Sequence, residues 1–253
     1  MSVRPGRPRR PRPRLTRRDA STPARLADAL SPDVAQAPGR VLVVPLGSLE
    51  QHGPHLPLGT DTLVAEAVAR RLAAVRPSAA LAPAVPFGAS GEHAGFAGTV
   101  SIGTEALRLL LVELLRDATA TWPAVLLVNG HGGNAEAVSA AVTLARSEGR
   151  AVAAVHLGAP GMDAHAGRAE TSMLLHLAPH LVALDRAEPG ATAPLRDLLP
   201  MLRTDGVRGV SPNGVLGDPT GASAEEGERW VDSLVELVVA AYDNLTTPTP
   251  PTG

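Results

Sequence analysis

The chain has 253 residues and no cysteine, and its 23 basic and 25 acidic side chains give a formal net charge of −2 at pH 7. The absence of cysteine excludes disulfides, thiolate metal sites and cysteine nucleophiles, so any metal must be bound by nitrogen and oxygen. Aromatic residues make up only 2% of the chain, which argues against a stacking surface for single-stranded nucleic acid.

The positive charge is concentrated at the N-terminus. Residues 1–18 contain eight arginines and no acidic residue, which leaves 15 arginines against 25 acidic residues in the remainder, a net charge of −10. That charge would repel a phosphate backbone, so we expect no nucleic-acid partner. No apolar run approaches the roughly 18 residues of a membrane span. The Arg-rich start also lacks the apolar stretch of a signal peptide, so we expect a cytoplasmic protein with no membrane partner.

Composition divides the chain into three parts. Residues 1–38 alternate Arg with Pro in their first half, which prevents a helix interior or a core, so we predict a disordered tail; binding of an anionic partner is the alternative. Residues 39–244 are long enough for a single catalytic domain with a sizeable core. Residues 245–253, rich in Thr and Pro, are predicted to be a flexible C-terminal tail.

Strand and helix patterns alternate between the two tails. In chain order we predict a strand at 40–44, a helix at 62–75, an irregular strand at 81–87, a helix at 104–119, a strand at 124–128, a helix at 135–147, a strand at 151–157, a helix from 170 and a last helix at 224–242. Thr104 is expected to cap its helix. The two prolines of 81–87 indicate an edge position. The alternation predicts an α/β fold of three α/β/α layers with a mostly parallel central sheet.

Three polar segments follow predicted strands. They are Glu50–Asp61, Asn129–Asn134 and His165–Glu170. In parallel α/β folds, ligands bind beyond the carboxyl ends of the strands. We therefore expect the three segments to converge on one site.

The side chains in these segments are typical metal ligands. Glu50 and His52 are two residues apart, so both project to the same side of an extended segment. Asp61 immediately precedes the helix at 62–75, and His131 lies among glycines. With Glu170, three carboxylates and two imidazoles can bind two divalent cations if one carboxylate bridges. Three negative ligands against four positive charges leave about +1, which a hydroxide can neutralise.

Each feature has a simpler interpretation when taken alone. Glu50 and His52 are compatible with an ordinary surface loop, and Asp61 with a helix cap. The segment 130–133 resembles a phosphate-binding turn, although it lacks the Gly-x-Gly-x-x-Gly spacing. His165 alone is compatible with a loop histidine. Their occurrence together at successive strand ends favours the metal site.

Three motifs connect the chain to a known family. Pro45–Asp61 (PLGSLEQHGPHLPLGTD), Asn129–Asn134 (NGHGGN) and His165–Ser172 (HAGRAETS), in this order, resemble the creatininase family of metal-dependent amidohydrolases. The resemblance extends over about residues 40–242. It implies a creatininase-like catalytic domain and a homo-oligomer such as a hexamer.

Further segments narrow the resemblance. Phe87–His93, Phe96–Leu107 and Gly214–Thr220 resemble the branch of the family that processes the modified ribosomal precursor peptide of mycofactocin, a redox cofactor. That branch implies a peptidase that removes the C-terminal Val-Tyr dipeptide by attack of metal-activated water. A creatinine- or formamide-type amidohydrolase is the alternative within the family. A non-catalytic metal-binding or ligand-binding subunit is the alternative outside the enzymes.

Four metal ligands are implied by the resemblance: Glu50, His52, Asp61 and His131. Asp61 would bridge the two ions. Creatinine-hydrolysing members have a glutamate two residues after the histidine of the Asn-Gly-His motif, where this chain has Gly133. We assign the missing ligand to Glu170, because two divalent cations need a third carboxylate and because Glu170 lies in the third motif. Nitrogen and oxygen ligands of this kind suit Fe²⁺, Zn²⁺, Mn²⁺ or Co²⁺.

The remaining candidates have less direct roles. His165 is expected to be catalytic, carrying a proton to the leaving amine. His55 either orients a ligand or supports its loop. Glu92, His93 and Phe96 either line the substrate cleft or form a structural turn. A peptide carboxylate could be met by Arg208, Ser211 and Asn213. Structural or surface positions are expected for His156, His176 and His180.

Overall fold

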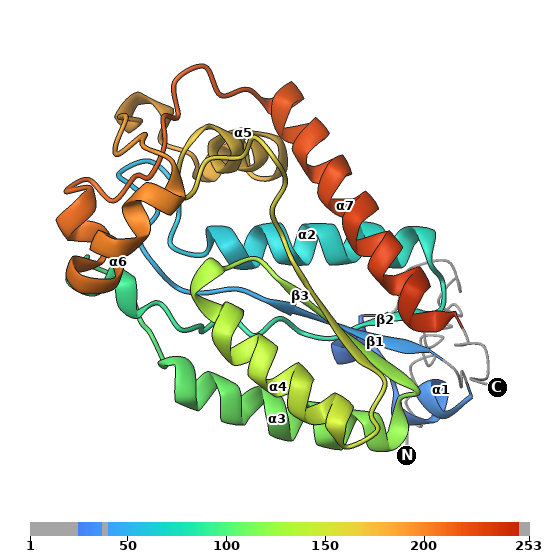
Figure 1. The fold of residues 1–253 in the computed structure, drawn as a ribbon. Coiled ribbons are helices and arrows are strands. Elements are labelled where there is room, and N and C mark those ends of the chain that lie inside the picture. The colour runs from blue at the N-terminus through green and yellow to red at the C-terminus, as the bar shows by residue number, and fades with distance from the viewer. Residues whose placement is uncertain (1–24, 37–39, 248–253) are drawn as a thin grey trace, which may run out of the picture.

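The central sheet is parallel throughout. A computed structural model describes residues 25–36 and 40–247 (Figure 1). Within these ranges the strands are β1 (Val41–Leu46), β2 (Ala79–Leu81), β3 (Ala124–Asn129) and β4 (Val152–His156), in the order β2-β1-β3-β4. Every residue of β1 and β3 is buried, as expected for strands covered on both faces. The predicted sheet is therefore confirmed.

Helices cover both faces of this sheet, so the three-layer α/β/α architecture is also confirmed (Figure 1). One face is covered by α2 (Thr60–Val75), α5 (Arg168–Leu177) and α7 (Ala224–Thr246), and the other by α3 (Thr104–Thr121) and α4 (Ala135–Ser147). Successive strand residues point to opposite faces. Val41 and Val43 accordingly join the first core, whereas Leu42 and Val44 join the second.

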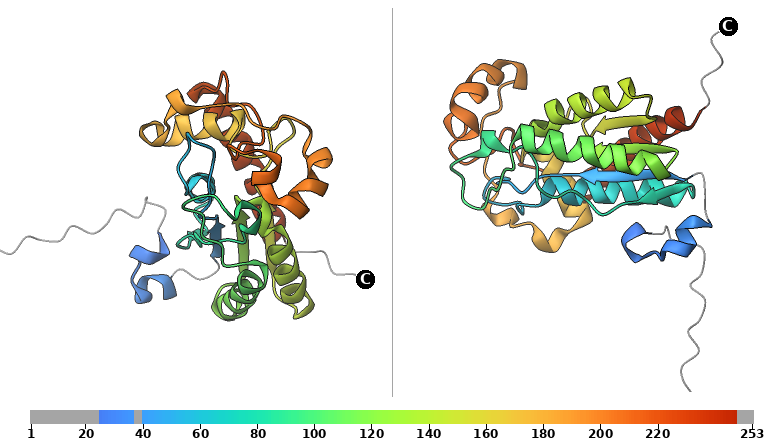
Figure 2. Two further views of the ribbon diagram at one scale, coloured as in Figure 1. Left: turned by 90° about the vertical axis from the view of Figure 1, so that its left-hand side faces the viewer. Right: turned by 90° about the horizontal axis from the view of Figure 1, so that it is seen from below.

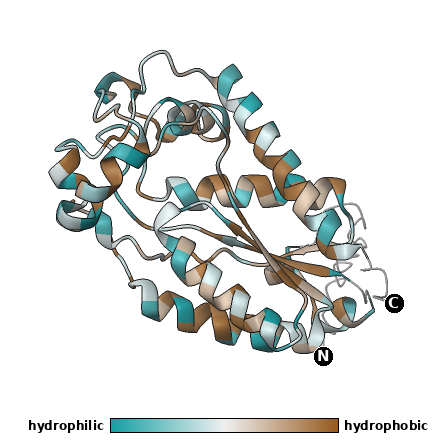
Figure 3. Ribbon diagram, viewed as in Figure 1, coloured by the Kyte–Doolittle hydropathy of each residue, from teal (hydrophilic) through white to brown (hydrophobic). Residues whose placement is uncertain are grey.

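The other helices are short or lie at the periphery. They are α1 (Ser31–Ala35), α6 (Leu195–Val210) and 3₁₀ turns at Leu26–Asp28, Gly91–His93, Gly132–Asn134, Pro179–Leu181 and Leu184–Arg186. Apolar residues concentrate on the strands and on the inner sides of the covering helices (Figure 3). Two leucines of the covering helices, Leu110 of α3 and Leu237 of α7, are 39% and 41% exposed.

Several predicted boundaries were wrong. The helix α2 begins at Thr60 after the N-cap Gly59, so Asp61 lies inside its first turn and does not precede the helix. Gly103 is the N-cap of α3, and Thr104 makes no capping hydrogen bond. The strand predicted at 81–87 ends at Leu81, because the prolines beyond it cannot donate to a ladder.

Helix α6 was not predicted, since the segment between α5 and α7 reads as irregular. Pro200 lies inside it, and Gly206 has φ +66° and ψ −176°, which is not helical. Both residues weaken a helical pattern. The helix lies at the carboxyl end of the sheet, away from the layers (Figure 2), and packs against the turn Gly91–His93.

The predicted tails are only partly described. Residues 1–24 and 37–39 of the N-terminal region and residues 248–253 at the C-terminus lie outside the described residues. Within the predicted N-terminal tail, the structure places α1 and the turn Leu26–Asp28, and Arg25 forms an isolated bridge to Leu81. The three-part division stays a prediction. No helix in ranges 25–36 and 40–247 is both long and apolar enough to cross a membrane.

Close packing of α7 on α5 gives a stability prediction. A Cβ added at Gly227 of α7 would lie 1.9 Å from the carbonyl oxygen of Ser172 in α5. Because backbone atoms cannot move aside cheaply, we expect Gly227→Ala to lower the free energy of unfolding by about 1–3 kcal/mol. Urea denaturation measures this change.

Gly91→Ala is the matched control for that substitution. An added Cβ there meets no atom within 4 Å, so we expect a change within about 0.5 kcal/mol. Equal stability of the Gly227→Ala variant and the parent protein would contradict the close helix contact.

Candidate metal centre and active site

The three polar segments meet at the carboxyl end of the sheet. They follow β1, β3 and β4, and the register pairs Leu46 with Asn129 and Asn129 with His156. The three strands therefore end at the same level, and their loops begin side by side. This register allows the segments to converge, and the distances below show which of their side chains meet.

A first group of candidate ligands contains Glu50, Asp61 and His131. Nδ1 of His131 lies 3.2 Å from Oε2 of Glu50 and 3.3 Å from Oδ2 of Asp61. All three side chains are buried, and one donor atom from each lies within 4.8 Å of the others. This spacing allows all three to reach one cation.

A second group contains His52, Asp61 and Glu170. Nε2 of His52 lies 3.0 Å from Oδ1 of Asp61 and 4.0 Å from Oε2 of Glu170. Asp61 thus contributes a different carboxylate oxygen to each group. The structure brings together all five residues that the sequence indicated as ligands, with Asp61 at the centre.

The environment of the buried Glu50 carboxylate indicates that these residues suit a cation. Both of its oxygens are buried and accept no hydrogen bond from any described residue. Nitrogens of His93 and His131 approach them to 3.2 Å, outside hydrogen-bond geometry. Burying a carboxylate without a partner costs several kcal/mol, which a bound cation would offset. Oxygen and imidazole donors in this arrangement fit divalent transition metals.

Crowding of charges shifts the pKa values in the cluster. Burial lowers the pKa of His52, but the carboxylates of Asp61, Glu170 and Glu50 outweigh burial and raise it to about 10. Burial raises the pKa of Glu170 to about 7, and the neighbouring Asp61 adds to this effect. A cation that binds here must therefore displace protons, so its affinity falls as the pH is lowered.

His165 has the opposite electrostatic character. Burial, followed by the neighbouring His52 and His93, lowers the pKa of His165 well below its ordinary value. Its Nε2 donates to the carbonyl oxygen of Gln51 at 2.8 Å, which leaves Nδ1 unprotonated and 3.7 Å from Oε1 of Glu50. A neutral imidazole with a free lone pair therefore faces the cluster.

The backbone after His165 positions Glu170. Ala166 has φ +51°, an unusual conformation for a residue other than glycine. In that conformation its amide donates to Oε2 of Glu170 at 2.6 Å. Strain of this kind is common near functional sites, and here it coincides with the orientation of a candidate ligand.

Buried polar side chains fix the loops around the cluster. Ser48 donates to Oδ2 of Asp61 at 2.5 Å. Asn134 accepts from the amide of Ala89 at 2.8 Å and donates to the carbonyl oxygen of Gly47 at 3.0 Å, so it joins three loops. A Cβ at Gly130 would lie 2.6 Å from the carbonyl oxygen of Asp61, so only glycine permits this approach to α2.

Sequence reasoning missed part of the cluster. Nε2 of His93 lies 3.2 Å from Oε1 of Glu50, and Oε1 of Glu92 lies 3.4 Å from Nε2 of His131. Both residues lie in the 3₁₀ turn Gly91–His93 and line a pocket, as expected, but their contacts with the ligands were not predicted. Gln51, which had no assigned role, places its Nε2 2.8 Å from Nδ1 of His93. Gln51 lies between the predicted ligands Glu50 and His52 in the sequence, and that position could have indicated a role in the site.

Other candidates have structural contacts. His55 shares a hydrogen bond of 2.8 Å with Oγ1 of Thr171, the residue after Glu170, and so links its loop to α5. Asn129 donates to Nδ1 of His156 at 2.9 Å. His176 lies 2.8 Å from a guanidinium nitrogen of Arg71. His180 is exposed.

The residues expected at a peptide carboxylate have other partners. Arg208 donates to the carbonyl oxygen of Gly95 at 2.7 Å and lies over the ring of Phe96. Ser211 donates to Asn213 at 2.8 Å. Two pockets lie beside the cluster, and neither is lined by Arg208, Ser211, Asn213 or Phe96.

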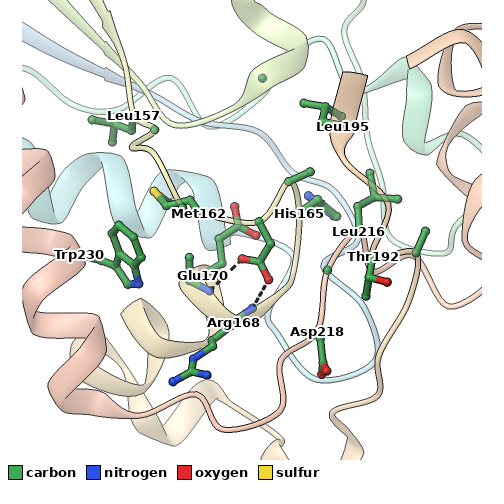
Figure 4. A pocket seen from close by; sticks show the side chains of 18 of the residues that line it. Leu157, Met162, His165, Arg168, Glu170, Thr192, Leu195, Leu216, Asp218 and Trp230 are labelled. Carbon is green, nitrogen blue, oxygen red and sulfur yellow. Dashed lines mark hydrogen bonds between the residues drawn. The ribbon is translucent and has the colours of Figure 1, made fainter. Parts of the chain in front are cut away.

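The two pockets adjoin each other at the cluster, and His131 and His165 line both. The first, here called the tryptophan pocket, has a volume of about 670 Å³ and includes Trp230 and Glu170 in its wall (Figure 4). The second, here called the α6 pocket, has a volume of about 730 Å³ and includes Glu50 and residues of α6. Both pockets therefore border the cluster.

Known proteins are similar to this chain in sequence. A protein named mycofactocin precursor peptide peptidase from Mycobacterium ulcerans is 53% identical over 81% of this chain and 85% of its own length. Its namesake from Mycolicibacterium smegmatis is 54% identical over 77% and 81%.

Known proteins also share the fold. A solved structure named creatininase Mn is 27% identical, covers 88% of this chain and 98% of its own, and superposes with a TM-score of 0.72. A related creatininase variant is described as the Zn-Zn type. The family profile described as creatinine amidohydrolase matches residues 27–242. The chain therefore belongs to the creatininase family of hydrolases.

Proposed function

We propose that this protein is a metal-dependent peptidase that removes the C-terminal Val-Tyr dipeptide from the modified mycofactocin precursor peptide. The observation that carries the proposal is the ligand cluster bordered by two pockets of about 670 and 730 Å³. An extended peptide that crosses the cluster would place residues in both pockets, whereas a small amide needs only one. The printed names of relatives 53% and 54% identical support the same substrate.

Two divalent ions, Fe²⁺, Zn²⁺ or Mn²⁺, would be bound by the five clustered residues. Glu50, Asp61 and His131 form one binding group, and His52, Asp61 and Glu170 form the other. Bound cations of this kind supply Lewis acidity and lower the pKa of water.

Glu170 takes the place of the ligand that is missing at Gly133 in this proposal. A Cβ at Gly133 would lie 2.3 Å from Oε1 of Glu92 and 2.4 Å from the carbonyl oxygen of Ala89. A longer side chain therefore has no room at that position. The carboxylate of Glu170 instead enters the cluster from α5, oriented by the amide of Ala166.

His165 is proposed to move the proton that the reaction requires. It lines both pockets, so it lies where the scissile bond of a crossing peptide would pass. The carbonyl oxygen of Gln51 keeps its proton on Nε2, and Nδ1 is free to accept a proton from water and donate it to the leaving amine. The low pKa of His165 favours rapid release of that proton.

Glu170→Gln tests the assignment of the fifth ligand. Because the amide is neutral and a weaker ligand, we expect metal content to fall from two ions per chain to about one and kcat/KM to fall about 100-fold or more. Elemental analysis of protein purified without chelators measures the metal. Glu66→Gln, which removes only an exposed ion pair with Arg70, is the control. Full metal content in the Glu170→Gln variant would refute this ligand.

His165→Ala tests the proton carrier. We expect kcat to fall about 10²–10⁴-fold, the range for loss of a general acid–base, while both metal ions remain bound. His180→Ala, at an exposed position, should leave both quantities unchanged. Loss of a full metal equivalent would make His165 a ligand, together with Glu50 and His52, whose donor atoms lie within 4.8 Å.

A direct assay tests the function itself. The modified precursor peptide and creatinine are incubated in parallel with the metal-loaded protein, and the products are identified by mass spectrometry. We expect release of Val-Tyr and no turnover of creatinine. Hydrolysis of creatinine alone would establish a small-amide hydrolase, and turnover of neither substrate with two metals bound would establish a binding subunit.

A further inference from the structure

The α6 pocket contains an arginine that has no partner within the protein. Arg203 lines this pocket together with the candidate ligands Glu50 and His131. Among the described residues, its guanidinium forms neither an ion pair nor a hydrogen bond. An arginine side chain keeps its positive charge at neutral pH. The α6 pocket therefore offers a free cation to an anionic group.

The tryptophan pocket offers no comparable group among the described residues. The arginine in its wall, Arg168, lies 2.7 Å from Glu226. Arg208 of α6 donates to the carbonyl oxygen of Gly95 and lines neither pocket. A carboxylate that enters the site would thus find its counter-charge at Arg203.

The acidic residues of the α6 pocket leave this arginine free. Glu50 and Glu92 approach His131 to 3.2 and 3.4 Å at the ligand cluster. Asp205 follows Arg203 by two residues, and side chains with that spacing do not face each other on a helix. Glu50 is fully buried, whereas Arg203 is exposed. Charge therefore changes along the pocket, from carboxylates at its buried end to a cation at its exposed end.

The backbone of α6 fixes Arg203 relative to the cluster. Gly206, three residues later, has φ +66°, and a Cβ there would lie 2.8 Å from the carbonyl oxygen of Glu92. The helix thus touches the turn that places the Glu92 carboxylate 3.4 Å from His131. Because the contact is between backbones, the helix cannot shift far from the cluster without breaking it.

The size and lining of the α6 pocket suit a short peptide. Its volume of about 730 Å³ lies within the range of ligand pockets. Leu199, Leu202 and Leu216 provide apolar surface for side chains such as those of valine and tyrosine. Two extended residues span at most about 7 Å, so a cation at a fixed place in the pocket would determine how far from the carboxylate a peptide is cut.

We infer that Arg203 binds the C-terminal carboxylate of the peptide substrate, so that the two residues to be released occupy the α6 pocket. This inference rests on the proposed peptidase function and deepens it, because it assigns the group that sets the length of the released fragment. The remainder of the precursor peptide then occupies the tryptophan pocket. Arg203 is a binding residue that determines specificity and takes no part in proton transfer.

Calorimetric titration tests the carboxylate site without turnover. Metal-loaded protein is titrated with Val-Tyr and with the same dipeptide amidated at its C-terminus, which lacks the negative charge. We expect Val-Tyr to bind about 10-fold more tightly, the lower end of the range for a charge-assisted pair, because Arg203 is exposed. Equal affinity for the two dipeptides, or no binding of either, would overturn the inference.

Three variants assign that preference to one side chain. Arg203→Gln should abolish it, and Arg203→Lys, which keeps the charge but loses the paired donors, should retain part of it. Arg196→Gln makes the same change in the same helix, at an exposed arginine that lines neither pocket, and should keep the full preference. A preference that survives Arg203→Gln would place the carboxylate on the metal ions and refute the subsite. Its loss in Arg196→Gln would assign it to the overall charge of α6, with the same consequence.

Peptide cleavage provides a second readout. In Arg203→Gln we expect KM for a peptide ending in Val-Tyr to rise about 10-fold with kcat little changed, because the lost contact serves ground state and transition state equally. KM for the amidated peptide should be the same in parent and variant. A fall in kcat with unchanged KM would contradict a binding role. Elemental analysis checks that the two proteins hold the same amount of metal.

The two proposals fail in different ways. If the parent protein cleaves no peptide, the peptidase function fails, and calorimetry still decides whether Arg203 binds a carboxylate. If peptides are cleaved but Arg203→Gln keeps the parent preference, the subsite is refuted alone. Circular dichroism of each variant identifies loss of folding, and the comparison of Val-Tyr with its amide in the parent protein does not depend on any variant.

Discussion

The site depends on the contacts of the buried Asp61 carboxylate with two histidines. One oxygen lies 3.0 Å from His52 and the other 3.3 Å from His131, so this side chain joins the loops after β1 and β3. Burial raises the pKa of Asp61, but the two imidazoles outweigh burial and hold it well below its ordinary value. Asp61 is therefore charged, and its neighbours must be protonated or bound to cations. A buried charge of this kind is tolerated only where such compensation is built in.

The surrounding fold keeps these charges in place. Parallel strands that end at one level bring the loops together, and Ser48 and Asn134 tie those loops through hydrogen bonds. The close crossing of α7 over α5 at Gly227 fixes the helix that carries Glu170. A rigid frame limits the reorganisation needed when a cation or a substrate binds, which favours both affinity and catalysis.

In the proposed metal centre, the fifth ligand comes from α5. Gly133 has no side chain, and Glu92 and His131 fill the space beside it. In the proposed arrangement the same charge comes from α5, through Glu170. Two pockets border the cluster. Two pockets offer more room than a small amide needs, which agrees with the proposed peptide substrate.

The sequence by itself determined the alternation of strands and helices, the parallel sheet and the residues of the polar loops, because these follow from local periodicity and from loops at strand ends. Only the tertiary structure placed His93 beside Glu50 and Glu92 beside His131, since these contacts join segments about forty residues apart that no local pattern relates. Helix α6 could not be predicted because Pro200 and Gly206 interrupt the helical pattern of the sequence. Its packing against the turn Gly91–His93 is visible only in the tertiary structure. The pockets likewise exist only where distant elements pack together.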